Sequence, residues 1–305
     1  MPRVPDKLSP YLRIGTCSWK YDSWKGLIYD PDKKYSPHHY LTDYARHYNT
    51  VEIDQWFWSL FGAGVKLPDP RTVETYSESV GDDFLFTVKA PNSITLTHHY
   101  AKQSARNWHL ANKPNPHFLN VDLLKQFLEI LEPMADKLGP VMFQFEYLNR
   151  QKMPSLKAFI DKLGEFFNRA PDGFDYAVEI RNPNYLRRSW FDFLKDLHIN
   201  PVLLEGYYMP PIAEVAERFD TSSGDVSVIR LMGPDRQKIE KLTGNQWDRI
   251  VAGKDESLNS IAQIVKRQIE RCRQVIVNVN NHYEGCAVLT IDRLIGMLGD
   301  HPATQ

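Results

Sequence analysis

The stretch YAVEIRNPNYLRRSWFDFLKDLH, residues 176–198, contains the repeating unit that decides the fold. Its first part, Tyr176–Ile180, is short and mostly apolar, as expected of a strand buried on both faces. Its last part, Ser189–His198, is predicted to be a helix. Parallel strands need crossovers of about a dozen residues or more, and a helix supplies such a crossover. The stretch is therefore one strand-then-helix unit of a parallel sheet.

The same unit recurs along the whole chain. Strands are predicted at Leu12–Cys17, Thr50–Ile53, Phe84–Lys89, Val141–Phe145, Tyr176–Ile180, Pro201–Leu204, Val226–Leu231 and Val275–Val279. Helices are predicted at Pro37–His47, Arg71–Val80, Val121–Leu138, Ser155–Asn168, Ser189–His198, Pro211–Phe219, Ser257–Arg273 and Ile291–Leu298. Eight such units predict a closed (β/α)8 barrel of the TIM type, in a single α/β domain over residues 1–305. The alternative, an open doubly wound sheet, usually begins with a glycine-rich turn, whereas here Gly15 is followed by TCSWKYDSWKG.

Two of the predicted connections are long: residues 92–120 after the third strand and residues 232–256 after the seventh. Connections that follow strands lie at the C-terminal face of a barrel, where barrels carry their active sites. No linker marks a second domain. We therefore expect the functional site at this face.

The composition excludes several classes of protein. The 305 residues include 37 basic and 38 acidic side chains, so no overall field attracts nucleic acid or an anionic membrane. Cys17, Cys272 and Cys286 are too few and too widely spaced for a disulfide framework or a zinc site made of cysteines. No stretch reaches the roughly 18 apolar residues of a membrane span, and the N-terminus has no apolar signal-peptide core. The sequence predicts a cytoplasmic protein and assigns no oligomeric state.

Charged and polar residues occupy strand positions that a barrel normally fills with valine, isoleucine or leucine. They are Glu52, Lys89, Gln144, Glu179, Arg181, Arg230, Asn278 and Asn280. Glu179 and Arg181 share parity in their strand and are expected to point to the same side. A lone buried charge is costly, so these groups must pair with one another or face a wet pocket. If these residues pair with one another, they form a structural ion-pair network. If they face a pocket, they form a binding site. The two interpretations are compatible.

The functional interpretation is a pocket for a small anion such as phosphate or carboxylate. Lys89, Arg181 and Arg230 would bind the anion, because a planar guanidinium suits bidentate recognition of such groups. Glu52 or Glu179 would be the catalytic acid or base, because a carboxylate in such a site can have a shifted pKa. The expected partner is thus a small anionic molecule.

Further substrate-binding candidates surround these strand ends. They are Trp19, Asp54, His98, Gln144, Asn280 and Asn281, of which the three amides would orient hydroxyls or carbonyls. Aromatic residues also crowd the loops after the first two strands, and they form either a hydrophobic lid or a surface that stacks a base or sugar ring. These are Trp19, Tyr21, Trp24, Trp56, Phe57 and Trp58. Cys17 is interpreted as a small buried residue, because a nucleophilic thiol needs a nearby base and a lowered pKa.

No metal ligand is assigned. The histidines of the first long connection form neither an HxH nor an HExxH pattern. The alternative is a site that combines His98 or His282 with Glu52, Asp54 and Glu179. Lysine and arginine at neighbouring strand ends argue against it, because they would repel a divalent cation. The sequence implies no cofactor.

Seven short motifs occur in an order that resembles one known family: IGTCSWKYDSWKGLIY, VEIDQWFW, FTVKAPNSITLTHH, LGPVMFQFE, AVEIRNPNYL, VSVIRLMG and VNVNNHYEG. They are similar to motifs of the DUF72 (YecE-like) family of uncharacterised proteins, over nearly the whole chain from Ile14 to the final helix. The resemblance implies a TIM barrel and matches His98 to a recurrent Thr-His of the family. It supplies no reaction.

Two motifs depart from the family's usual pattern. The family typically reads VEINSTFY where this chain reads VEIDQWFW, so Asp54 replaces asparagine and Trp56 replaces threonine. Gln144 is followed by FEY instead of the usual Gln-x-Pro-Pro. The chain therefore resembles a divergent subgroup whose pocket carries an extra acid and a bulkier wall.

Three functions remain open from the sequence. The preferred one is an enzyme that acts on a small anionic or sugar-like substrate at the C-terminal mouth of the barrel, with a hydrolase, lyase or isomerase reaction. The second is a metal-dependent hydrolase of phosphodiesters or nucleic acid, which rests on analogy of fold alone, and the balanced charge argues against it. The third is a non-catalytic binding or scaffold protein in which the polar strand ends are structural.

Overall fold

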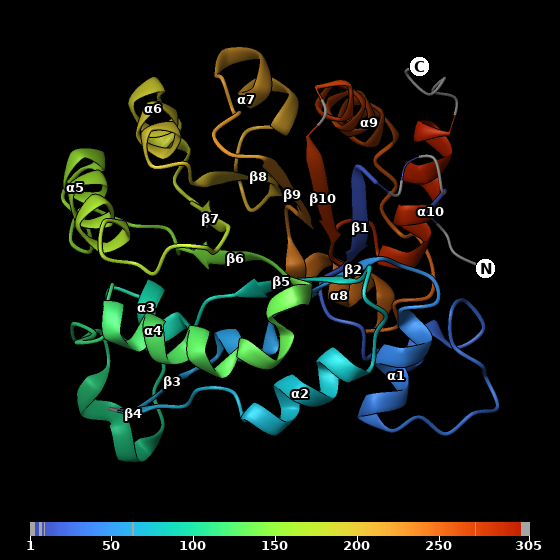
Figure 1. Ribbon diagram of the computed structural model, residues 1–305, viewed down its shortest axis with the longest axis horizontal. Coiled ribbons are helices and arrows are strands. Elements are labelled where there is room, and N and C mark those ends of the chain that lie inside the picture. Colours follow the sequence, from blue (N-terminus) through green and yellow to red (C-terminus); the bar gives the residue numbers. More distant parts are fainter. Residues whose placement is uncertain (1–3, 6–7, 9, 63, 272, 300–305) are drawn as a thin grey trace.

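The computed structural model of the chain describes residues 4–5, 8, 10–62, 64–271 and 273–299. Eight parallel strands lie at its centre and helices surround them (Figure 1). Neighbouring strands follow the order β1-β10-β9-β8-β7-β6-β5-β2, so the strands keep their chain order around the barrel. The predicted (β/α)8 architecture is confirmed, and all eight predicted strands are present. Cys272 lies outside the described residues.

The eight barrel strands are β1 (Leu12–Thr16), β2 (Thr50–Ile53), β5 (Leu85–Lys89), β6 (Leu138–Gln144), β7 (Tyr176–Glu179), β8 (Asn200–Gly206), β9 (Val226–Gly233) and β10 (Gln274–Val279). The helices packed outside them are α1 (Pro37–Tyr44), α2 (Pro70–Glu78), α4 (Val121–Ile130), α5 (Leu156–Phe167), α6 (Arg188–Asp196), α7 (Ile212–Arg218), α9 (Asp255–Glu270) and α10 (Ala287–Leu298). Four of these helices begin at a polar side chain that accepts a hydrogen bond from a backbone N–H of the first turn, which fixes where each helix starts. These N-cap residues are Ser36, Asp69, Asn120 and Ser155.

The predicted helix over Val121–Leu138 is too long. Helix α4 ends at Ile130, a 3₁₀ helix covers Glu132–Lys137, and Leu138 already belongs to β6. Pro133 explains the break, because proline has no N–H and restricts the residue before it. The predicted helix over Ile291–Leu298 is too short at its start, since α10 begins at Ala287.

The barrel closes between β1 and β2 through side chains as well as backbone. A parallel β-bridge of the backbone joins Cys17 to Glu52. In addition, the Tyr44 hydroxyl accepts a hydrogen bond from the Thr16 N–H at 2.8 Å and donates one to the Thr50 carbonyl at 3.1 Å. Gly15 is required at this seam, because a Cβ atom there would lie 1.9 Å from the Thr50 carbonyl oxygen. The close approach of β1 and β2 at Thr50 therefore depends on glycine at position 15.

Inside the barrel a polar layer lies on an apolar one. Met142, Ala177, Val202, Val226, Val228 and Ile276 form a buried cluster that contains strand residues alone. Side chains two positions apart on a strand point to the same side. The positions that follow these residues on the inner face, toward the C-terminal strand ends, are Gln144, Glu179, Leu204, Arg230 and Asn278. The inner face thus becomes polar at the end where barrel sites lie.

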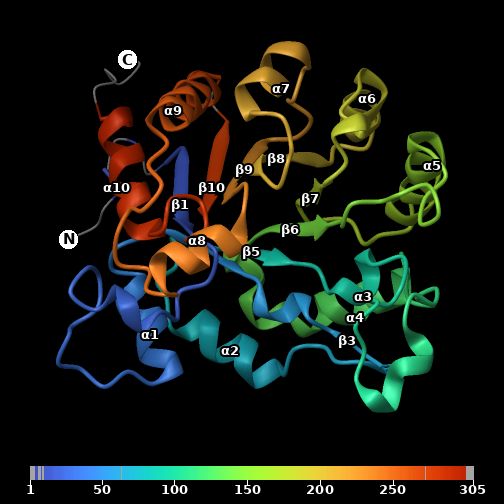
Figure 2. The ribbon, with the colours of Figure 1, turned by 180° about the vertical axis from the view of Figure 1, so that it is seen from behind.

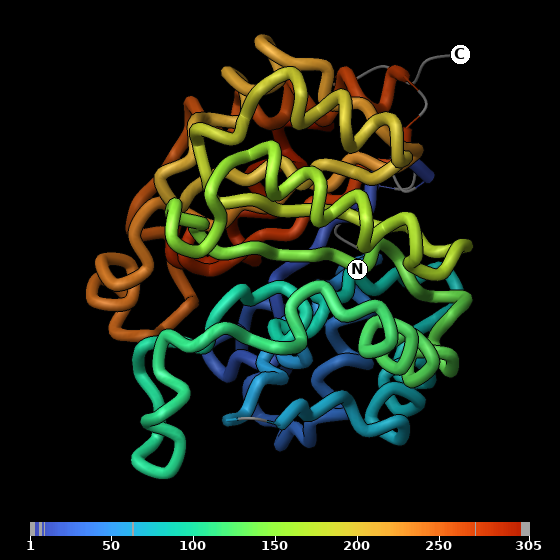
Figure 3. The backbone as a smooth tube through the Cα atoms, turned by 90° about the vertical axis from the view of Figure 1, so that its left-hand side faces the viewer, coloured from blue at the N-terminus to red at the C-terminus, as the bar shows by residue number. Residues whose placement is uncertain are grey.

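The long connections add short elements at the C-terminal face. Residues 92–120 contain α3 (Asn92–Thr95), and residues 232–256 contain α8 (Arg236–Thr243), which Figure 2 shows in front of the strands. A two-stranded hairpin of β3 (Leu60–Phe61) and β4 (Gly64–Val65) follows β2. The segment between α3 and α4 projects from the body of the molecule at the lower left of Figure 3.

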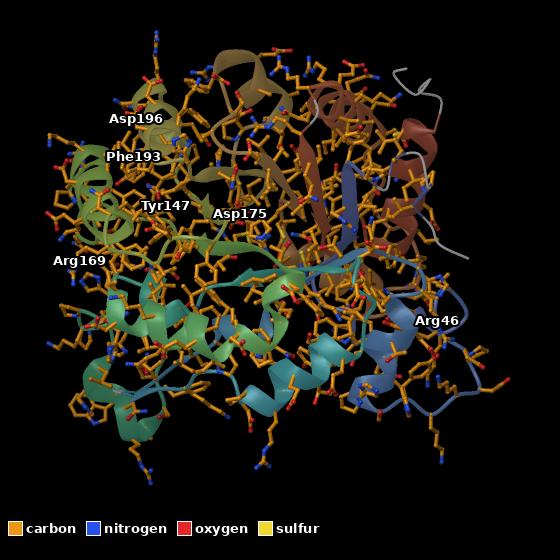
Figure 4. All side chains as sticks on the ribbon, viewed as in Figure 1. Arg46, Tyr147, Arg169, Asp175, Phe193 and Asp196 are labelled. Atoms are coloured by element: carbon orange, nitrogen blue, oxygen red, sulfur yellow. The ribbon has the colours of Figure 1, made fainter. Side chains whose placement is uncertain are left out.

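Side chains fill the space between the strands and the outer helices (Figure 4). Phe193 lies between α5 and α6, 5.9 Å from the Trp190 ring, whereas Arg169 and Asp196 lie at the outer edge. None of the helices in the described part of the chain combines the length and the apolar character that a bilayer crossing demands.

Candidate functional site

Five strands bring polar side chains to one level near the C-terminal end of the barrel. Glu52 is on β2, Lys89 ends β5, Gln144 ends β6, Glu179 ends β7 and Arg230 is on β9. Gln144 and Glu179 face each other in register across the β6–β7 pair. We call these five residues, together with Arg181 and Asp54 just beyond their strands, the charged layer. Five members lie on parallel strands and the other two lie just beyond strand ends, so the layer is a consequence of the fold.

Arg230 is the centre of the charged layer. Its Nε and Nη2 atoms donate to the two carboxylate oxygens of Glu52, both at 2.7 Å. Its Nη1 atom donates to Glu179 and, at 3.3 Å, to Gln144 Oε1. Arg230, Glu52 and Glu179 are fully buried. All three nitrogens of the guanidinium are therefore occupied by protein acceptors, and the planar group is held from two sides.

Arg181 extends the ion pairs outward. Its Nε atom donates to Glu179 Oε1 at 3.0 Å, as the shared parity of these two residues predicted. Its guanidinium carbon lies 4.0 Å from the centre of the Tyr207 ring, and 21% of the side chain is exposed. The Nη1 and Nη2 atoms donate to no residue in the described ranges. Arg181 is thus fixed by stacking and by one ion pair while one edge of its guanidinium stays available.

The two arginines determine the charge state of Glu179. Burial works to raise the pKa of this carboxyl, but the charges of Arg230, Arg181 and Lys89 outweigh it and hold the pKa below its usual range. Glu179 is therefore a carboxylate at neutral pH. Glu52, Arg230, Glu179 and Arg181 form a continuous chain of alternating charge, which matches the ion-pair network that the sequence offered as one interpretation.

Lys89 is different from the other strand-end charges. Only 7% of the residue is exposed, yet its ammonium forms no hydrogen bond or ion pair with any residue that the structure describes. Its Nζ atom lies 4.0 Å from the centre of the Phe57 ring. Burial, followed by the positive charge of Arg230, lowers the pKa of Lys89 from its usual 10.5 to about 8, although Glu52, Asp54 and Glu179 work to raise it.

Asp54 is the matching unpaired acid. It follows β2 directly, is half-buried, and has no ion pair with a described residue. Burial and then the Glu52 carboxylate raise the pKa of Asp54, and the charges of Lys89 and Arg230 partly oppose this. The pKa values of Asp54 and Lys89 are thus shifted toward each other, which is a common feature of proton-transferring sites.

Cys17 contacts Glu52 of the charged layer. Its Sγ atom is 3.6 Å from Glu52 Oε2 and 3.9 Å from the Met232 sulfur. Burial, reinforced by the Glu52 charge, raises the pKa of the Cys17 thiol well above its usual range. The thiol is therefore protonated and unreactive at neutral pH, in agreement with the structural interpretation of this residue.

The remaining candidates are less closely tied to the charged layer. Trp19 is buried and packs edge-on against Tyr76 at 5.1 Å, so its ring belongs to the core. The His98 ring is half-buried, with Nδ1 3.0 Å from Thr97 Oγ1, and no hydrogen bond or ion pair in the described ranges joins it to the charged layer. The Asn281 side chain accepts from the Ala287 N–H at 2.8 Å and caps the start of α10.

Asn280 and His282 form a separate contact after β10. Asn280 Oδ1 is 2.5 Å from His282 Nδ1 and also accepts from the His282 N–H at 2.9 Å. The other ring nitrogen of His282 is 3.3 Å from Glu240 on α8. Within the described ranges, no three His, Cys, Asp or Glu side chains converge as a metal site would require. The structure therefore does not bring His98 or His282 together with the acids of the charged layer.

Most of the aromatic residues after β1 and β2 are buried, and Trp58 is the exposed member of the predicted group. Trp24 and Trp56 pack in the core, while Phe57 covers Lys89. Two contacts of the site could not be read from the sequence: Phe57 over Lys89, and Tyr207 over Arg181. Each joins elements that follow different strands, and the sequence indicates only that aromatic residues follow these strands.

Comparison with known proteins identifies relatives over most of the chain. Residues 13–305 match the sequence model of a family described as "Protein of unknown function DUF72". The UPF0759 protein YecE of Escherichia coli (strain K12) is 27% identical over 179 residues, which are 58% of this chain and 51% of that protein. The chain thus spans about half the length of the curated relatives that it matches.

Solved structures show the same fold. The crystal structure of a DUF72 family protein from Thermotoga maritima covers 95% of this chain and 100% of its own, with 21% identity and a TM-score of 0.66. A DUF72 family protein from Enterococcus faecalis covers 95% of this chain and 96% of its own, with 16% identity and a TM-score of 0.63. At these identities the likeness concerns the fold.

Proposed function

The chain belongs to the DUF72 family, a family of unknown function, and from its own side chains we propose that it is an enzyme acting on a small anionic substrate at the C-terminal end of the barrel. Lys89 and Arg181 bind the anion, and Asp54 transfers protons. The observation that carries the proposal is Lys89, a residue only 7% exposed whose ammonium has no hydrogen bond or ion pair with any residue that the structure describes. A buried charge without a partner destabilises a fold, and such groups are found where function needs them.

Four of the five charged strand-end residues pair with one another, and Lys89 does not pair within the described ranges. The ion-pair chain holds two carboxylates and two guanidinium groups, so it is neutral as a unit. Lys89 therefore adds a positive charge beside a neutral network, and the nearby acid that acts on it from outside that network is Asp54, which has no ion pair with a described residue. A small anion at Lys89 would supply the missing partner, and a charge-assisted hydrogen bond would form in a water-poor setting.

The cation roles differ from those that the sequence indicated. Arg230 has Nε, Nη1 and Nη2 occupied by Glu52, Glu179 and Gln144, so we assign it to the scaffold. Nη1 and Nη2 of Arg181 donate to no described residue and the side chain is partly exposed, so Arg181 remains with Lys89 as an anion-binding residue.

The structure also favours a different residue, Asp54, for the acid–base role. Glu52 and Glu179 were favoured by the sequence, but both are fully buried and are paired with Arg230. Neither carboxylate is free to exchange a proton with a substrate. Asp54 is half-buried, has no ion pair with a described residue and has a raised pKa, so it holds a proton more readily than an ordinary carboxyl.

Calorimetric titration of the whole chain with phosphate and with glycolate tests the anion-binding proposal. We expect at least one anion to bind, and Lys89→Met to weaken its affinity about 10- to 100-fold, as expected when a charge-assisted contact is lost. Lys89→Arg should retain most of the affinity because it keeps the charge. Lys254→Met is the matched control, since Lys254 is also a partly buried lysine over an aromatic ring, 4.7 Å from the centre of Tyr283.

Two outcomes would count against the proposal. Binding that is equally weakened by Lys89→Met and Lys254→Met would show a general effect of removing positive charge. No detectable binding of either anion would favour the purely structural interpretation of the charged layer.

A further inference from the structure

We propose that Lys89 is a nucleophile that forms an imine with a small carbonyl compound carrying an anionic group, such as a 2-oxo acid. The inference deepens the proposed function and rests on it, because the same anion site would bring the carbonyl group to Lys89. It assigns a class of substrate, an oxo acid, and a first covalent step.

The surroundings of Lys89 suit an attacking amine. The side chain is almost completely buried and ends β5, at the face of the barrel where sites lie. Within the described ranges no carboxylate forms an ion pair with it, so nothing ties up its nitrogen lone pair once the ammonium loses a proton. On one side its Nζ atom lies over the face of the Phe57 ring, 4.0 Å from the ring centre.

The charges around Lys89 act in the same direction. Desolvation and a neighbouring cation are the two usual ways in which a protein makes a lysine nucleophilic at neutral pH. Here burial comes first and Arg230 second, and together they bring the pKa of Lys89 to about 8. An exposed lysine has a pKa near 10.4, so at pH 7.5 the unprotonated fraction of Lys89 is roughly 200-fold larger.

The reaction needs no external oxidant, reductant or cofactor. The neutral Nζ adds to the carbonyl carbon, a C–N bond forms, and the carbonyl oxygen takes up a proton to give a carbinolamine. The C–O bond then breaks, the oxygen leaves as water with a second proton, and the nitrogen lone pair forms the C=N bond. In sum, one ammonium and one carbonyl give one protonated imine and one water. Asp54 is the neighbouring group that can accept and return these protons.

Arg181 provides the anion-binding part of the site. Its free guanidinium edge suits the planar carboxylate of an oxo acid, and Tyr207 and Glu179 hold the group in place. A substrate with both groups would thus be bound at its carboxylate and attacked at its carbonyl carbon. Arg181 is a binding residue in this scheme, whereas Lys89 is the catalytic residue.

The test uses glyoxylate, the smallest aldehyde that also carries a carboxylate, with cyanoborohydride and the whole folded chain at pH 7.5. Hydride from the reagent reduces the protonated imine to a stable secondary amine, and peptide mapping gives the labelling rate of each lysine. We expect Lys89 to be labelled about tenfold or more faster than exposed Lys20. Lys254 is the internal control for burial beside a ring, and it should be labelled more slowly than Lys89.

Glycolate and acetaldehyde separate this inference from the proposed function. Glycolate has the carboxylate without the carbonyl, and it should slow the labelling of Lys89 by glyoxylate. Arg181→Met should slow labelling by glyoxylate about tenfold more than it slows labelling by acetaldehyde, which has no anion.

Lys89 labelled no faster than Lys20 would overturn the imine proposal, and the anion proposal would survive if glycolate still bound through Lys89 and Arg181. Fast labelling of Lys89 by both aldehydes, with no effect of glycolate or of Arg181→Met, would have the opposite meaning. Such a result would support Lys89 as the nucleophile and would contradict the proposed anion-binding site.

Discussion

Arg230 binds Glu52 through two parallel hydrogen bonds of 2.7 Å, from Nε to Oε2 and from Nη2 to Oε1, although neither side chain reaches solvent. The two residues are 178 positions apart in the sequence and lie on different walls of the barrel, β9 and β2. Their contact therefore spans the interior and connects the two halves of the charged layer. Because both charges are removed from water, each one is stabilised mainly by the opposite charge of the other.

Removing one partner of this pair should strongly destabilise the protein. We expect Arg230→Met to lower the free energy of unfolding by about 3–5 kcal/mol, because it leaves two buried carboxylates without their main counter-charge. Arg236→Met is the control: Arg236 contacts Glu240 at the same distance, 2.7 Å, but its side chain is 63% exposed. That variant should lose less than about 1 kcal/mol. Urea unfolding of the two variants measures the difference, and equal losses would disprove the buried network.

Lys89 should make the fold less stable at neutral pH than it would be without this lysine. Its folded-state pKa of about 8 lies below the usual 10.5, so between these values the unfolded chain binds more protons at this residue. The contribution of Lys89 to the free energy of unfolding therefore rises as the pH increases from about 8 to 10.5. Below pH 8 the buried ammonium destabilises the fold by its full amount. At pH 7 that cost is on the order of 3 kcal/mol.

The variant Lys89→Met tests this directly. The difference in unfolding free energy between Lys89→Met and the unmodified chain should favour the variant most at pH 7 and shrink as the pH rises toward 10.5. Taking the difference cancels the titrating groups that Lys89 does not influence. A difference that does not change with pH would mean that Lys89 titrates normally in the folded protein.

Asp54→Asn should separate binding from proton transfer. Glycolate affinity should change little, because Asp54 does not bind the anion, while the rate of imine trapping at Lys89 should fall about 100-fold if Asp54 moves the protons. The Asp54 charge also works to raise the pKa of Lys89, so the pH profile of labelling should shift to lower pH in the variant. Because that shift alone would speed labelling at pH 7.5, a labelling rate in the variant that does not fall would contradict a proton-transfer role for Asp54.

Gly206 at the end of β8 should tolerate no side chain. Its φ is +130°, and a Cβ atom there would lie 2.3 Å from the Gly233 carbonyl oxygen. Gly26 also has a positive φ, +83°, but open space surrounds its Cβ position. We expect Gly26→Ala to cost roughly 1 kcal/mol from backbone strain and Gly206→Ala to cost clearly more, since β8 and β9 must separate. Thermal unfolding of both variants compares them, and similar melting temperatures would contradict the close approach of these strands.

The sequence predicts the barrel well because its signal is local. Short apolar runs such as Val275–Val279 are strands buried on both faces, and eight of them alternate with helices. The parity of Glu179 and Arg181 likewise predicts that they share a side, and the structure pairs them at 3.0 Å. Helix α8 was missed within a long connection although its ends carry readable signals: Asp235 caps its start, and Gly244 adopts a left-handed conformation after its end.

The partners within the site depend on distant parts of the chain and could not be predicted. The sequence offered three residues of the charged layer as candidates for contact with a ligand: Glu52, Glu179 and Arg230. Only the packed barrel shows that Arg230 forms ion pairs with the two glutamates. The same packing leaves Lys89 and Asp54 unpaired within the described ranges. Closure of the barrel places strands that are far apart in sequence beside one another. This arrangement determines which charged side chains form ion pairs with other described residues and which do not.

The pKa of Lys89, measured by NMR titration of lysine side chains isotopically labelled at the ε-carbon, tests the central claim most directly. Lys89→Arg assigns the signal. We expect a midpoint of about 8 in the free protein and a rise to about 9 or above when glycolate binds, because an opposite charge favours the ammonium. A midpoint near 10.5 that glycolate does not move would contradict it.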